Sequence, residues 1–133
     1  MVSSSYLERM IQKEPLTKDG FVDYLGKVDE LRIIEKPLLY NTGLISSIEF
    51  PKWILKVSIE KYQSQEEKEI TLVHELAHAF YLAIKLDDIF HDKDENTKNK
   101  KEVEDLIETE SQRFYKENKE FVKELYQKHL IKE

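Results

Sequence analysis

The sequence predicts an α+β fold in which a small three-stranded sheet, antiparallel or mixed, packs on a buried helix and a long C-terminal helix. Three observations support this fold class. Apolar residues surround the helical wheel between Leu72 and Ile84, as in a buried helix. Segments in which apolar residues recur at every second position precede that helix, and a segment with apolar residues three and four positions apart follows it. The 133 residues suit a single domain, 1–133, with one core.

Two short helical signals precede the sheet. Ser5 and Glu8 have the spacing of a capping box, and the apolar stripe that follows them predicts a helix that Pro15 ends. The second signal, in residues 21–28, is weak, and irregular structure explains it equally well.

Strands are expected between residues 31 and 60. Residues 31–36 are rich in β-branched side chains, and a turn signal follows at residues 41–43. Residues 44–50 and 53–60 read as the arms of a hairpin around Pro51-Lys52, because apolar and polar side chains alternate in the second arm. One face of this sheet is therefore expected to pack on the helices.

Two long helices are expected after the sheet. Ser64 begins a second capping box, which predicts a helix over residues 65–86. Residues 87–100 are charged and almost devoid of apolar side chains, so they are interpreted as a solvated connection. Asn99 caps the last helix, whose apolar stripe predicts that it continues unbroken to about His129.

Composition limits the classes of function. The net charge is −6, and lysines are scattered among acidic residues, so nucleic acid is not expected as a partner. The absence of cysteine excludes disulfides, thiolate zinc sites and a cysteine nucleophile. No stretch has the length and apolarity of a membrane span, and the N-terminus does not look like a signal peptide. The cytoplasm is the expected location, and membrane binding is not expected.

The main chemical motif lies in the segment TLVHELAHAF. His74 and His78 are four residues apart, so they lie on one face of a helix where both imidazoles can bind one tetrahedral metal. Glu75 lies beside them, where a general base can take a proton from a water at the metal. Burying such groups without partners costs about 2–7 kcal/mol each, and a metal would supply a partner.

A catalytic zinc site needs a third protein ligand, and the last helix carries several carboxylates. On a helical wheel Glu110 falls inside the apolar stripe, Glu104 lies at its edge, and Glu108 lies farther toward its flank. His91, in the charged connection, is expected to be a surface histidine. The wheel alone leaves the three glutamates open, because it does not show how two helices cross.

The segments TLVHELAHAF and, thirty residues on, ETESQRF resemble the ImmA/IrrE family of metallo-endopeptidases, including short relatives on phages and mobile elements. Members of the family have HExxH followed by a helix with a glutamate six residues before Phe or Leu and a small residue between. Glu108, Ser111 and Phe114 occupy those places. The resemblance covers residues 31–126 and implies a zincin-like fold with Glu108 as the third ligand, ahead of Glu104 and Glu110.

The resemblance also implies a function, zinc-dependent hydrolysis of peptide bonds. One zinc per chain is expected, although two histidines and a carboxylate also suit other divalent metals. Tyr81 and Tyr115 are candidate oxyanion donors, although packing is the expected role of both. The substrate would be a protein, such as a repressor or antitoxin of the same element, bound at an exposed sheet edge. One alternative is a metal-binding regulatory module without proteolytic activity, and another is a purely structural helical domain in which the histidines are core residues. The oligomeric state stays open.

Overall fold

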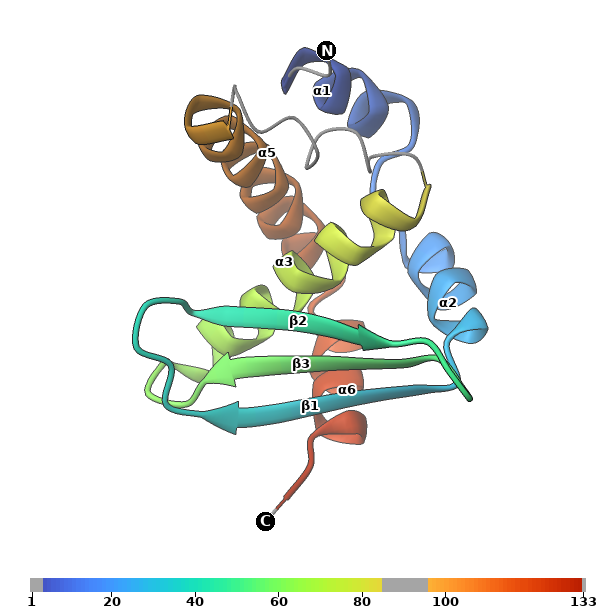
Figure 1. Cartoon of the computed structure of the whole chain (residues 1–133), viewed down its shortest axis with the longest axis vertical. Helices are drawn as coiled ribbons and strands as arrows, with labels where there is room; N and C mark the ends of the chain where they lie inside the picture. Colours follow the sequence, from blue (N-terminus) through green and yellow to red (C-terminus); the bar gives the residue numbers. More distant parts are fainter. Residues whose placement is uncertain (1–3, 85–95, 133) are drawn as a thin grey trace.

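The computed structural model describes the backbone of residues 4–84 and 96–132 and the side chains of residues 8–81 and 101–132. Helices and strands are mixed in an α+β fold, which confirms the predicted fold class at this coarse level (Figure 1). The elements in chain order are α1 (Ser4–Lys13), α2 (Lys18–Lys27), β1 (Glu30–Lys36), β2 (Gly43–Ile48), β3 (Ile54–Glu60), α3 (Gln65–Ile84), α5 (Asn96–Glu117) and α6 (Lys119–His129).

The three strands form one mixed sheet in the order β1-β3-β2. The predicted hairpin is confirmed, because β2 pairs antiparallel with β3, while β1 pairs with β3 in parallel. The register places Ile33, Val57 and Ile45 in one row across the sheet. Their side chains face the helices, and α3 and α6 lie behind the sheet in Figure 1. The sheet is thus one layer, with helices covering one of its faces.

Helix α3 is buried as its sequence predicts. Leu72, Val73, Leu76 and Ala77 are each at most 1% exposed, and they belong to a hydrophobic core that includes residues from every element except β2. The helix contacts β2 and β3 on one side and α5 on another. It begins at Gln65, where the backbone N–H of Glu67 donates to Ser64 Oγ at 3.1 Å. The predicted cap of this helix is confirmed.

The weak signal in residues 21–28 corresponds to a real helix. Helix α2 begins one residue after Thr17, whose side-chain oxygen accepts a hydrogen bond from Gly20 N at 3.0 Å. Phe21 and Tyr24 then point into the core. A threonine cap before a short apolar stripe therefore forms this helix, and the structure favours the helical alternative.

The C-terminal helix was predicted wrongly in two respects. It is not continuous, because α5 ends at Glu117 and α6 begins at Lys119. The Asn118 side chain donates to Phe114 O at 3.0 Å, and the break lets α6 turn so that Val122 and Tyr126 are buried beside β1. Helix α5 also begins at Asn96, so residues 96–100 are helical and not part of the connection. The rest of that connection, including His91, lies outside the described residues.

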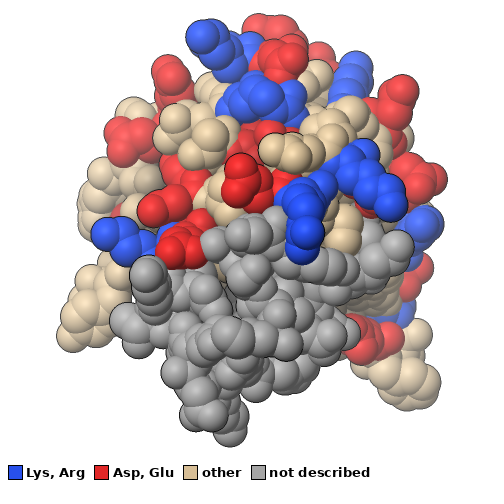
Figure 2. All heavy atoms as spheres, turned by 90° about the horizontal axis from the view of Figure 1, so that it is seen from above, with Lys and Arg blue, Asp and Glu red and all other residues tan. Residues whose placement is uncertain are grey.

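The surface carries charges of both signs. On the face shown in Figure 2, Lys and Arg side chains are interspersed with Asp and Glu. Of the helices that the structure describes, none combines the length and the apolar character required to cross a bilayer.

Candidate metal centre

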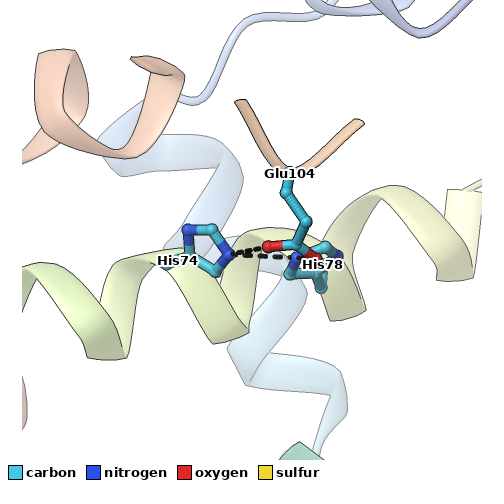
Figure 3. A group of neighbouring side chains, drawn as sticks. All are labelled: His74, His78 and Glu104. Atoms are coloured by element: carbon cyan, nitrogen blue, oxygen red, sulfur yellow. Dashed lines mark hydrogen bonds and ion pairs between the residues drawn. The ribbon is translucent and has the colours of Figure 1, made fainter. Parts of the chain in front are cut away.

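Two histidines and one glutamate converge between α3 and α5. His74 and His78 lie one turn apart on α3, with side chains only 14% and 12% exposed, and Glu104 of α5 points between the two rings (Figure 3). Glu104 Oε2 is 2.8 Å from His74 Nε2, and Glu104 Oε1 is 2.9 Å from His78 Nε2. The two Nε2 atoms are 3.1 Å apart. Three possible ligand atoms thus come from three different side chains.

These atoms fit a metal ion by spacing and by chemistry. Metal–nitrogen bonds of about 2.0–2.1 Å in a tetrahedral site place neighbouring ligand atoms about 3.3 Å apart, close to the separations seen here. Within the described residues, His74, His78 and Glu104 form the group whose ligand atoms all lie within 4.8 Å of one another. Two imidazoles and one carboxylate, with a fourth position open, are a donor set of catalytic zinc sites. Other divalent metals accept the same donors.

Glu108 lies on the other side of the His74 ring. Its Oε1 is 2.8 Å from His74 Nδ1, and its Oε2 accepts a hydrogen bond from Gln112 at 2.9 Å. A carboxylate at Nδ1 holds the proton there and leaves the lone pair of Nε2 for a metal. The structure therefore brings Glu104 to the Nε2 atoms, whereas Glu108, the ligand that the family resemblance implies, contacts Nδ1.

The electrostatics of this cluster favour a positive charge at the Nε2 atoms. Burial alone would lower the pKa of His74, but hydrogen bonds to Glu104 and Glu108 and the charges of Glu104 and Glu75 raise it to about 9. Hydrogen bonds to His74 and His78 hold the pKa of Glu104 well below its usual range. With a proton only on Nδ1, the Nε2 lone pair of His74 would face a carboxylate. A second proton or a metal ion removes that repulsion.

Glu75 lies next to this cluster with its carboxylate available. Burial raises its pKa, while the charges of His78 and His74 oppose that effect. Within the described part of the chain, this carboxylate forms no hydrogen bond or ion pair. A general base has to reach the water that it deprotonates, and a raised pKa makes it a better proton acceptor; Glu75 lines a cleft beside the cluster and has a raised pKa.

A cleft of about 1100 Å³ leads to the cluster. It lies between the start of β2, α3 and α5, and Glu75, Glu104 and Asp105 are among its lining residues. Gly43 allows β2 to approach α3, because a Cβ atom there would lie 2.6 Å from Thr71 Cγ2 and 3.1 Å from Glu75 Cγ. The absence of a side chain at this position therefore lets the start of β2 pack closely against α3 where both line the cleft.

The sheet has one open edge beside the cleft. No strand that the structure describes pairs with the outer edge of β2, which is an end strand of the sheet. The outer edge of β1 is partly paired, because Ile131 N donates to Ile33 O at 2.8 Å next to a bridge between Ile33 and Leu130. Among the described residues, the edge nearest the histidines is thus the one to which no strand or bridge is paired.

The remaining predicted site residues lie elsewhere. Glu110 is buried, but its carboxylate accepts hydrogen bonds from Leu16 N at 2.7 Å and from Arg113. The Tyr81 hydroxyl donates to a backbone carbonyl of the segment between α1 and α2, at 3.1 Å. The Tyr115 hydroxyl donates to Glu69 Oε1 at 2.8 Å. None of the three lines the cleft.

Sequence reasoning placed Glu108 ahead of Glu104, whereas the structure brings Glu104 to both Nε2 atoms, and it did not single out Gly43. The available signal was spacing: Glu104 and Glu108 are four residues apart on one face of α5, as His74 and His78 are on α3. Two pairs with equal spacing can face each other across a helix contact. No pattern in the sequence indicated that β2 would approach α3 at Gly43.

Comparison with known proteins adds no assignment. No protein-family model, no curated protein and no solved structure matches this chain. The geometry of the cluster and the cleft is therefore what indicates the function of the chain.

Proposed function

We propose that the protein is a zinc-dependent metallo-endopeptidase. One observation carries this proposal: His74, His78 and Glu104 converge on one point in a cleft, beside the carboxylate of Glu75, which has no hydrogen-bond partner among the described residues. A site that hydrolyses peptide bonds needs a metal position with room for water, a base next to it, and space for a polypeptide.

The chain's own residues have separate tasks in this reaction. His74, His78 and Glu104 would hold the ion, and Glu108 orients the ring of His74 through Nδ1. A bound zinc ion supplies an acidified water and polarises the carbonyl of the scissile bond. Glu75 takes a proton from the attacking water and later donates it to the amine that leaves.

The open edge of β2 supports a polypeptide as substrate. An extended segment can add to such an edge through main-chain hydrogen bonds, which bind a peptide without requiring one sequence. The edge borders the same cleft as Glu75, so a segment paired with it passes close to the base. A repressor or antitoxin encoded nearby, in the cytoplasm, stays the predicted substrate.

The first test is the metal content of protein purified without added metal. About one zinc per chain is expected in the parent and none in His78→Ala, with both proteins folded by circular dichroism. Hydrolysis of a quenched peptide library is then compared between the parent and Glu75→Gln, which should keep the metal and lose activity. A parent without metal, or unchanged hydrolysis in Glu75→Gln, contradicts the proposal.

A binding module without proteolytic activity is the second candidate. Large apolar side chains are exposed on β2 and beside its two ends, and such groups are typical of protein contacts. They are Leu39, Tyr40, Leu44, Ile48 and Phe50. Two results together would favour this candidate. The zinc-loaded parent would cleave no library peptide, and the parent and Glu75→Gln would bind a partner protein with equal affinity.

A further inference from the structure

A buried hydrogen bond joins α3 and α5 away from the candidate metal centre. The Tyr115 hydroxyl of α5 donates to Glu69 Oε1 of α3 at 2.8 Å, and Gln65 Nε2 donates to the other oxygen of Glu69 at 2.9 Å. Glu69 is 1% exposed and Tyr115 is 6% exposed. A carboxylate so deeply buried is costly without partners, so the bond is expected to persist wherever the two helices meet.

The contacts between the two helices follow one order. Glu69 of α3 contacts Tyr115 of α5. Farther along α3, His74 contacts Glu108, and His78 contacts Glu104. Partners later in α3 are therefore earlier in α5. Glu104, Glu108 and Tyr115 share one face of α5, since spacings of four and seven residues return to the same side of a helix.

The same contacts reach two sides of α3. Glu69 lies five residues before His74, which at 100° per residue places the two side chains about 140° apart around the helix. The contacts at His74 and His78 share one face of α3, so by themselves they leave α5 free to rotate about that face. The contact at Glu69, on another side of α3 and more than one turn from His74, restricts that movement.

We propose that the hydrogen bond between Tyr115 and Glu69 positions α5 on α3, and thereby places Glu104 and Glu108 against His74 and His78. This inference rests on the proposed metal site. It makes Tyr115 and Glu69 positioning residues, which touch neither substrate nor metal. It also gives a role to the buried tyrosine that the sequence singled out as an oxyanion donor. Buried polar pairs that fix the register of packed helices are a known use of such groups.

The test compares three variants with the parent. Tyr115→Phe removes the hydroxyl and keeps the ring, and Glu69→Gln keeps an oxygen that accepts from Tyr115 but removes the charge. Tyr126→Phe is the matched control, because it removes a similar bond, from Tyr126 to Glu35 at 2.5 Å, which joins α6 to β1. Zinc affinity is measured by competition with a chromogenic chelator, ligand geometry by the visible spectrum of the Co(II)-loaded protein, and folding by thermal melting.

Tyr115→Phe is expected to weaken zinc binding by about tenfold, the lower end of the effect of groups that orient ligands, and to change the Co(II) spectrum. Glu69→Gln should show a smaller loss of two- to threefold, and it supplies a measurement if Tyr115→Phe does not fold. The control should melt earlier with parental zinc affinity. Parental affinity and spectrum in both variants, with lowered melting temperatures, would show a merely structural bond and overturn the inference. A parent that binds no zinc overturns the proposed function, and this inference with it.

Discussion

Glu104 and Glu108 are expected to differ in what their removal does to zinc binding. Glu104 lies at both Nε2 atoms, so Glu104→Ala removes a proposed ligand. Glu108 lies at Nδ1 of His74, so Glu108→Ala removes only the group that orients that ring. Loss of such an orienting group costs about 10- to 100-fold in metal affinity. Since a factor of ten is about 1.4 kcal/mol, Glu108→Ala should lose about 1.4–2.8 kcal/mol of binding free energy, and Glu104→Ala more.

The assay is a competition titration of zinc against a chromogenic chelator at constant pH and ionic strength. Thr109→Ala is the control on the same helix, because among the described residues the exposed Thr109 hydroxyl bonds only to the backbone carbonyl of Asp105. It should keep the parental affinity within about twofold, as an exposed substitution away from the cluster does. A larger loss for Glu108→Ala than for Glu104→Ala would refute the assignment and support the ligand that the family resemblance implies.

Three further predictions concern the cleft and the sheet. Gly43→Ala should lower the free energy of unfolding by about 1–3 kcal/mol, because the new Cβ atom crowds Thr71. Adding Thr71→Ser deletes the Cγ2 methyl that would lie 2.6 Å from that Cβ atom, so it should recover part of the loss in a double-mutant cycle measured by urea unfolding. Burial alone would raise the pKa of Glu35, but hydrogen bonds from Tyr126 and Lys68 hold it below 4.5. Glu35→Gln should therefore lower the free energy of unfolding by about 2 kcal/mol. This loss of stability should be complete above pH 4.5 and should shrink as the pH falls below that value, where the parent carboxylate becomes protonated. A loss of stability that does not depend on pH would contradict the prediction. Asp105 lines the cleft, and no Lys or Arg is among the described residues that line it. Asp105→Asn should therefore reduce kcat/KM several-fold for peptides with Lys or Arg near the scissile bond. An equal reduction for neutral peptides, or a reduction that does not depend on salt concentration, would refute this selectivity.

The fold was predictable where the signal is local. The hairpin of β2 and β3 follows from the Pro51-Lys52 break and from alternation in the arm that follows it, and the buried character of α3 follows from apolar residues around its whole circumference. The parallel pairing of β1 with β3 was not predictable, because no local pattern indicates which strand lies in the centre of a sheet. The break at Asn118 was missed because the apolar stripes of α5 and α6 continue one another in sequence, although they face different parts of the core.

The candidate site was predictable on one helix and not between helices. The positions of His74, Glu75 and His78 follow from spacing within α3, and the structure places all three at the cleft. The third partner depends on how α5 crosses α3. A helical wheel reports only which face of α5 is buried, and several carboxylates lie on or near that face.

Glu110 shows why burial does not identify a ligand. Of the three candidate glutamates, Glu110 is the one that falls inside the apolar stripe of the helical wheel, and it is buried as the wheel predicts, at 6% exposure. Its carboxylate is satisfied by the backbone of Leu16 and by Arg113, so its burial reflects the docking of the segment between α1 and α2. Glu104 is half-exposed because it lies in a wall of an open cleft. A catalytic metal needs access to water and substrate, and a ligand at the edge of the apolar stripe is where such access remains.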